Sequence, residues 1–438
     1  MSGAATRGAR FGGLTRGITR NVVALGLVSL LTDISSEMLV YLIPLFLANV
    51  LAASPSVIGL IEGIAESVAS LLRLVSGAIS DRIGRRKLLV GIGYSGSVVG
   101  KAFFLVATAW PIVLLARLGD RIGKGIRTAP RDALITDSTP ADSRGRAFGL
   151  HRAMDTAGAF IGVAAAAVVV WAVQGDMTQL AEGTFRDLVL LALVPGVLAI
   201  VTVVVGVHDV HEEARRERAA AKRSLADGTA ASPATGRFHR LRGLVSGLPR
   251  PYWLFVLATL LFTIGNSSDA FLALRSQQLG VTVRDLLLMI VAFNITNAVV
   301  AWPVGALSDR IGRRALIALA WSIYAFTYAG FAIAGSGTPV VAMWLAYGVY
   351  YGVNDAVGKA LVADLAPQER RATAFGLITA VVGFALLPAS LIAGLLWDVI
   401  GPAAPFWFGA ACAAGATILL LVAVRPPAAV SAQERSPA

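Results

Sequence analysis

The sequence has little of what a disulfide-bonded, metal-binding or soluble protein needs. Its 438 residues include one cysteine and four histidines, and only 15% of them are charged, against about 25% in an average soluble domain. A single cysteine excludes an internal disulfide framework and a clustered thiolate site. Because Cys412 lies within an apolar run, we interpret it as a buried apolar side chain.

Apolar residues, in contrast, make up 56% of the chain and are gathered into runs of about 20, the length that crosses a bilayer core as a helix. The sequence therefore predicts an all-α integral membrane protein with twelve transmembrane helices. The expected spans are residues 22–50, 57–80, 88–109, 111–136, 146–173, 187–207, 251–279, 284–307, 315–335, 338–364, 372–397 and 403–424.

The spans form two sets of six, separated by a polar segment. We expect a cytoplasmic N-terminal tail (1–21), a first six-helix bundle (22–207), a cytoplasmic linker (208–250), a second six-helix bundle (251–424) and a cytoplasmic tail (425–438). The linker combines many basic residues with Ser, Ala, Gly and Pro, a composition typical of flexible connections. The first apolar run is too long for a signal peptide and is predicted to be retained.

Basic residues in the short loops lie on one side of the predicted membrane. Besides both termini and the linker, that side carries Arg82, Arg85, Arg86, Lys87, Arg144, Arg146, Arg310, Arg313, Arg314, Arg370 and Arg371. The other side has little beyond Arg186 and Arg284. The positive-inside rule therefore places both termini and the linker in the cytoplasm, for a protein of the cell (inner) membrane. Charges in short loops do not form a nucleic-acid surface, so the net charge of +12 predicts no nucleic-acid binding.

A ten-residue segment occurs twice in the chain. Residues 77–86 read GAISDRIGRR and residues 305–314 read GALSDRIGRR. Two further pairs follow the same order: residues 137–150 with 364–377, and residues 35–37 with 267–269. Three matches in one order indicate duplication and predict two pseudo-symmetric halves.

The repeated segments resemble the loop 2–3 and loop 8–9 signature of the major facilitator superfamily, and the resemblance covers essentially the whole chain. It implies a secondary active transporter that exposes a small solute alternately to each side of the membrane. In that family the signature acts as a gate, where glycine allows close helix approach and aspartate and arginine form charge contacts. The resemblance places this gate at Gly77, Asp81, Arg82, Gly84, Arg85 and Arg86, and in the second half at Gly305, Asp309 and Arg310.

Within the family, the chain is similar to a subset of bacterial permeases in residues 32–38 and 123–132, and this similarity names no substrate. The chain departs from typical drug/proton antiporters in two places. Arg121 stands where the helix 4 motif that starts at Arg117 usually has glycine, and the fifth span lacks the usual Gly-Pro pair. Both departures argue against generic multidrug efflux.

Charged side chains inside the spans are costly, about 2.5–3.5 kcal/mol each at a helix centre, so they usually face a cavity or a partner. We predict a substrate and proton-coupling site at Asp33, Glu37, Glu62, Glu66, Lys101, Arg117, Asp120, Arg121, Lys124, Asp155, Asp269, Asn294, Asp355 and Lys359. Most of these residues belong to the first half. Acids opposite a cationic helix can exchange protons near neutral pH; the alternative is a static ion-pair scaffold.

Asp33 and Glu37 are the first candidates for proton coupling, because four-residue spacing places them on one face of a helix. We expect each to alternate between a neutral state and a charged state paired with Arg117 or Arg121. The abundant cations predict a small polar or anionic solute, and export is the favoured direction. The alternatives are a hydrophobic-drug/proton antiporter and, from another class, a lipid flippase or a transporter-like solute sensor.

Enzymatic activity is not predicted. The sequence has no Ser-His-Asp or P-loop pattern, and residues 91–96 fit G-x-G-x-x-G only within a predicted helix, which indicates helix packing. His208, His211 and Glu212 adjoin the polar linker and are interpreted as solvated rather than metal-binding. We therefore expect a monomeric carrier with no cofactor or metal, whose partners are a small-molecule substrate, protons and the lipid bilayer.

The predicted orientation can be tested with reporter fusions. Green fluorescent protein fused within residues 208–250 should fluoresce, and alkaline phosphatase fused within residues 174–186 should be active, because the basic residues are one-sided. Phosphatase activity at the linker instead would reverse the orientation.

Overall fold

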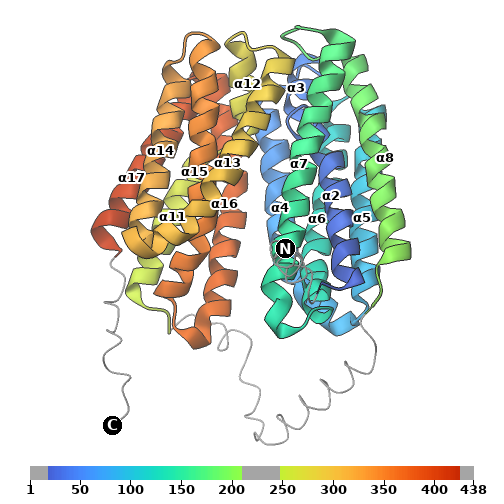
Figure 1. The fold of residues 1–438 in the computed structure, drawn as a ribbon. Coiled ribbons are helices and arrows are strands. Elements are labelled where there is room, and N and C mark those ends of the chain that lie inside the picture. Colours follow the sequence, from blue (N-terminus) through green and yellow to red (C-terminus); the bar gives the residue numbers. More distant parts are fainter. Residues whose placement is uncertain (1–17, 210–246, 425–438) are drawn as a thin grey trace, which may run out of the picture.

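The computed structural model describes residues 18–209 and 247–424, except for the side chains of Gly305, Ala306 and Asp309. Every regular element in these two ranges is a helix (Figure 1). The two tails and most of the linker, with His211 and Glu212, lie outside the described residues.

The first bundle contains six helical spans, two of which are divided into shorter pieces. Its helices are α2 (Arg20–Val40), α3 (Ile43–Asn49), α4 (Pro55–Ile83), α5 (Arg86–Ala102), η1 (Phe103–Val106), α6 (Trp110–Asp137), η2 (Ala141–Ser143), α7 (Arg144–Gln174) and α8 (Glu182–Gly206). The first span breaks at Tyr41 and Leu42, just before Pro44, whose ring and missing N–H interrupt a continuous helix.

The second bundle repeats this order. Its helices are α11 (Arg250–Gly265), α12 (Ala270–Gln278), α13 (Val283–Ile311), α14 (Arg313–Ile333), α15 (Thr338–Leu365), η3 (Gln368–Arg370), α16 (Arg371–Val399) and α17 (Ala404–Ala423). Here the first span breaks earlier, at residues 266–269. These are Asn, Ser, Ser and Asp, side chains that compete with the backbone for hydrogen bonds; the Ser268 hydroxyl accepts from the amide of Ala270 at 3.3 Å.

The predicted twelve-span, all-helical fold is confirmed. By length and composition, nine of the described helical spans are long and apolar enough to cross a membrane. The other three are α4, α6 and α15, which carry several charged or polar residues and still run parallel to their neighbours in Figure 1. The residues that lower their hydropathy are among those predicted to form the site.

Both copies of the repeated segment turn at a glycine. Gly84 ends α4 with φ of 68°, and Gly312 separates α13 from α14 with φ of 91°. L-residues rarely adopt positive φ, so glycine is needed at both turns. The turn directs α5 and α14 back across the membrane.

The two bundles contact one another along α4 with α16 and along α7 with α13. Glycine makes the first contact close: a Cβ on Gly59 would overlap the carbonyl oxygen of Ser390, and one on Gly63 would lie 3.0 Å from the backbone of Leu387. Small residues of this kind let membrane helices approach closely.

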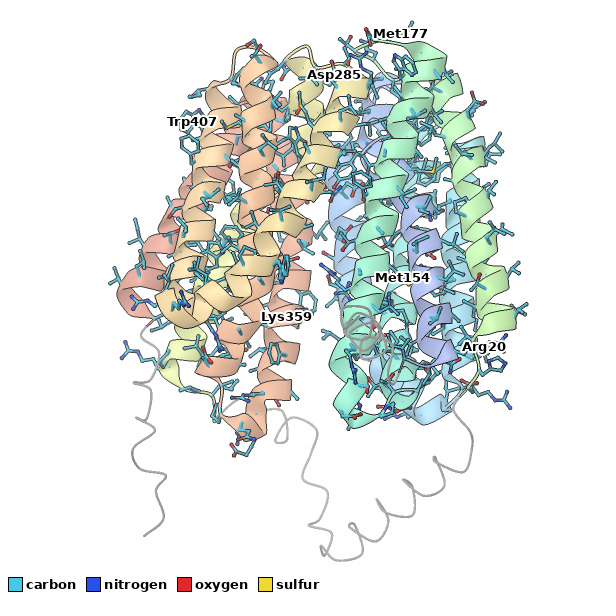
Figure 2. The ribbon with its side chains drawn as sticks, viewed as in Figure 1. Arg20, Met154, Met177, Asp285, Lys359 and Trp407 are labelled. Carbon is cyan, nitrogen blue, oxygen red and sulfur yellow. The ribbon has the colours of Figure 1, made fainter. Side chains whose placement is uncertain are left out.

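These contacts concentrate at one end of the molecule. Helices α2 and α11 begin, and helices α8 and α17 end, at the other end of the molecule, which we call the linker end. The bundles touch at the opposite end and diverge towards the linker end (Figure 1). Figure 2 shows Met177 and Asp285, one from each bundle, at the opposite end. There the Gln277 side chain donates to Asn49 at 2.7 Å and to the Thr178 carbonyl at 2.6 Å, and Arg284 forms an ion pair with Asp176.

Separating α4 from α16 should open the opposite end. An impermeant maleimide added at that end should label a single cysteine in the cavity about ten times faster in Gly59→Ala than in the parent protein. This increase corresponds to a shift of about 1.4 kcal/mol in the equilibrium between the closed and open conformations. The label site is Ser268→Cys in a Cys412→Ala background, because Cys412 is the one native cysteine. Gly149→Ala is the matched control, since no atom lies within 4 Å of its added Cβ. Unchanged labelling of Gly59→Ala would show that this contact does not control access.

Candidate functional site

A cavity of about 480 Å³ lies between the two bundles. Such a volume is usual for small-molecule sites, which span about 300–1,000 Å³. It is lined by α2, α4, α6 and α7 on one side, and by the break at residues 266–269, α13, α15 and α16 on the other. The structure brings nine predicted residues to this cavity: Glu37, Glu62, Glu66, Arg117, Arg121, Lys124, Asp269, Asn294 and Asp355.

Two arginines of α6 are paired with acids of α4. Arg117 donates to both carboxylate oxygens of Glu62, at 2.9 and 2.6 Å, and both side chains are buried. One turn further along, Arg121 forms an ion pair with Glu66 at 2.8 Å. In this structure α4, and not α2, supplies the acids paired with both arginines, so the expected pairing of Asp33 or Glu37 with Arg117 or Arg121 stays a prediction about another state.

A second, smaller cavity of about 110 Å³ lies inside the first bundle. Lys101 reaches it and donates to the hydroxyls of Ser35 and Ser36, at 2.7 and 2.9 Å. Asp120 lines it too, and its Oδ1 atom is buried without a hydrogen-bond partner in the described part of the chain. Unpaired buried oxygens of this kind usually bind water, so the chamber is polar and suited to proton movement.

Asp33, at the edge of this chamber, meets Asp155 of α7. Their two carboxyl groups are near neighbours across the contact of α2 with α7, and the Ser29 hydroxyl donates to Asp155 at 2.6 Å. Two carboxylates this near one another repel, so the pair is favoured when one of them carries a proton. Gly158 brings α7 this close, since its Cβ would lie 3.0 Å from the Cα of Leu30. Sequence reasoning selected both acids but missed their contact.

Lys124 lies between the two cavities and lines both. Its charge acts on Asp33, Glu37 and Glu66, yet within the two described ranges it forms no ion pair at 4.0 Å or less. Of the described α6 cations that line the central cavity, it is therefore the one that an incoming anion can reach without displacing a bound carboxylate.

In the second bundle the site is built around Asp269. The break between α11 and α12 places its carboxylate in the central cavity, where the hydroxyl of Tyr347 donates to it at 2.6 Å. Sequence reasoning missed the neighbouring aromatic residues Tyr41, Phe293 and Tyr351, which also line the cavity, because aromatic side chains in a span usually indicate packing. The spacing of Tyr347 and Tyr351, one helical turn apart, was the available signal.

Two predicted residues of α15 differ in position. Asp355 lines the cavity and lies 4.0 Å from Arg152 of α7, which also approaches Asp155 at 3.7 Å. Lys359, labelled in Figure 2, is exposed and lines neither cavity.

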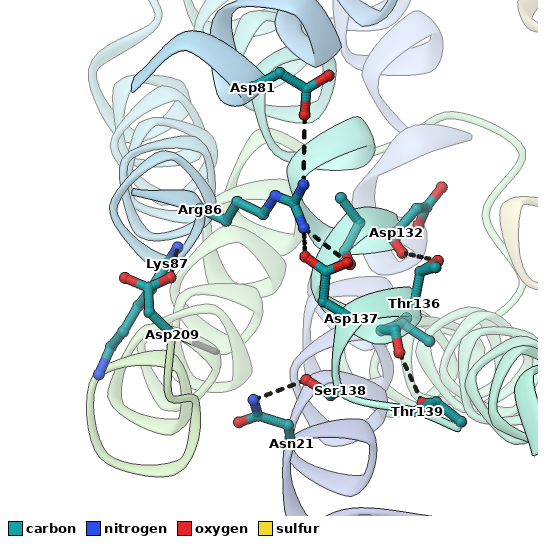
Figure 3. A network of polar contacts seen from close by, with 12 residues as sticks. Asn21, Asp81, Arg86, Lys87, Asp132, Thr136, Asp137, Ser138, Thr139 and Asp209 are labelled. Atoms are coloured by element: carbon teal, nitrogen blue, oxygen red, sulfur yellow. Dashed lines mark hydrogen bonds and ion pairs between the residues drawn. The ribbon is translucent and has the colours of Figure 1, made fainter. Parts of the chain in front are cut away.

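The predicted gate lies at the linker end. Arg86 contacts Asp81 at 3.4 Å and forms an ion pair with Asp137 at the end of α6 (Figure 3). In the second half Arg313 pairs with Asp364. A Cβ on Gly77 would meet Ala129 at an ordinary 3.6 Å. Arg82, Arg85 and Arg310 are exposed. The surroundings of Gly305 and the side chain of Asp309 are not among the parts that the structure describes.

Comparisons with known proteins agree with this architecture. The family model of the Major Facilitator Superfamily matches residues 25–276 and 254–437. An uncharacterized MFS-type transporter of Methanocaldococcus jannaschii is 33% identical over 412 residues, which cover 93% of this chain and 95% of that protein.

Solved structures share the fold at low sequence identity. A D-xylose-proton symporter has a TM-score of 0.71 at 15% identity, covering 94% of this chain and 98% of its own. An inward-facing, unoccupied bacterial homologue of the human lysosomal transporter Spinster has a TM-score of 0.68 at 14% identity, covering 92% and 94%. With the family match over both halves, these likenesses show that the chain belongs to the major facilitator superfamily and is a multi-pass membrane transporter, not an enzyme.

Proposed function

We propose that the chain is a proton-coupled secondary transporter of a small polar or anionic solute. The observation that carries the proposal is that two acids of neighbouring helices, Asp33 and Asp155, adjoin the chamber that Lys124 lines, where one proton can be shared between them. The linker end is taken as cytoplasmic on the one-sided arginine and lysine pattern. The cavity then faces the cytoplasm, with the external side closed, as one state of an alternating-access cycle.

Proton and anion binding are linked through Lys124. When Asp33 or Glu37 takes up a proton, Lys124 loses a counter-charge and becomes available to an anion in the central cavity. When the anion leaves, the lysine again favours the charged acids. Proton and solute therefore bind together.

This linkage bears on direction. A proton and a solute that bind together move in the same direction, so an inward proton gradient would drive uptake. Export, the direction expected from the sequence, would require proton and solute to exclude each other. The geometry of Lys124 supports joint binding, and we therefore propose uptake.

Removing the titratable group should uncouple transport. Asp33→Asn keeps the size and polarity of the side chain and can donate through its amide N–H, but it cannot take up or release a proton. We expect it to lose uphill, gradient-driven uptake while keeping solute exchange within about threefold of wild type, because exchange needs no net proton movement. The measurement uses purified protein in liposomes containing a trapped pH-sensitive dye, challenged with a panel of small organic acids and amino acids.

Asp142→Asn, the same change at an exposed position on η2, is the control and should behave as wild type. Equal uphill uptake by Asp33→Asn and wild type would place proton coupling elsewhere. If solute entry makes the lumen more alkaline instead of more acidic, protons leave as the solute enters. That result would contradict joint binding and support antiport, and with it export.

A further inference from the structure

The carboxylate of Asp269 lies in the central cavity without a cationic partner. Tyr347 donates one hydrogen bond to Oδ1, and among the residues that the structure describes no lysine, arginine or histidine forms an ion pair with Asp269. A carboxylate at membrane depth is costly unless a partner of opposite charge approaches it. The partner can come from the solute.

Aromatic rings surround this carboxylate. Phe293 and Tyr351 line the cavity with their centroids 5.4 Å apart and their planes 86° apart, and Tyr41 of the first bundle lines it as well. Aromatic faces beside a carboxylate bind organic cations through cation–π attraction.

Two polar side chains of the same wall lack partners. Ser267 is 5% exposed, and its hydroxyl oxygen lies beside the Tyr328 hydroxyl without a well-formed hydrogen bond in the described part of the chain. The amide nitrogen of Asn294 is buried without a hydrogen bond in the same described ranges, and both residues line the cavity. Buried polar atoms without partners are rare in native proteins, and in a cavity either water or a polar solute supplies the missing partners.

Most other charges around the cavity neutralise one another. Glu62 pairs with Arg117 and Glu66 with Arg121. Asp355 has Arg152 at 4.0 Å. Among the described lining residues, what remains is Lys124 and Glu37 of the first bundle and Asp269 of the second; when Glu37 is protonated, one cation and one anion are left.

We propose that the transported solute is a zwitterion, with an ammonium group held by Asp269 and a carboxylate or phosphate directed to Lys124. This inference rests on the proposed function and names its substrate class. The ammonium would donate to the Asp269 carboxylate and the Ser267 hydroxyl and lie against Phe293 and Tyr351.

Solutes of a single charge fit less well. An anion alone would leave Asp269 unpaired, and a hydrophobic cation alone would leave Lys124 unpaired, once the bundles close and exclude water. A zwitterion satisfies both and links the two bundles through one molecule.

The test uses ω-amino acids of increasing chain length, each matched by the fatty acid and the alkylamine that lack one of its charges. Binding to the detergent-purified full-length protein is measured by isothermal titration calorimetry. At least one ω-amino acid should bind about tenfold or more tightly than both of its matched probes. If no ω-amino acid exceeds its matched probes, the proposal is overturned; a preference for alkylamines would instead indicate a cation site.

Variants separate the two ends of the solute. Asp269→Asn should weaken zwitterion binding about 10- to 100-fold and leave fatty-acid binding unchanged, whereas Asp269→Glu should restore part of the affinity. Asp142→Asn controls for the chemical change. The proposal would also be overturned if Asp269→Asn and wild type bound the zwitterion with equal affinity, provided that thermal unfolding shows both proteins to be folded.

The two proposals fail in different experiments. If fatty acids bind as tightly as zwitterions while liposomes still show proton-coupled uptake, the zwitterion inference falls and the transporter proposal stands. If zwitterions bind through Asp269 but their transport moves no protons, the zwitterion inference stands and the proposal of proton coupling falls.

Discussion

The buried ion pair of Arg117 with Glu62 is the contact on which the first bundle depends. Removing one partner of such a pair leaves an uncompensated buried charge, at a cost of about 3–5 kcal/mol. Because both residues recur four positions later, as Arg121 and Glu66, the same alignment of α4 with α6 satisfies two pairs at once. That alignment leaves Lys124, three residues beyond, facing both cavities near several acids but in no ion pair at 4.0 Å or less within the described residues.

Close helix approach, which glycine permits, positions the polar groups. A Cβ on Gly93 would lie 2.6 Å from the Cβ of Arg127, and one on Gly158 would lie 3.1 Å from the Cβ of Asp33. Without these side chains α6 lies against α5, and α7 lies against α2. The second contact is what brings Asp33 near Asp155, so Gly158 supports the proposed proton site.

The duplicated halves use the same segment differently. Residues 35–37 remain helical, and Lys101 holds the two serines through hydrogen bonds. Their counterparts at residues 267–269 are unwound, and Tyr347 holds the acid instead. A lysine behind one segment and tyrosines behind the other make the first half suited to charge exchange and the second to holding an organic cation.

The sequence by itself determined the twelve spans, the two halves and most of the charged residues of the central cavity, because bilayer thickness and the cost of buried charge act on local composition. It selected Asp33, Asp155 and Asp269 for the site. Only the tertiary structure decided which acid meets which cation, that Asp33 meets another acid, and that aromatic rings surround Asp269. These pairings depend on the rotation and closeness of whole helices, which distant glycines set, so no local pattern contains them.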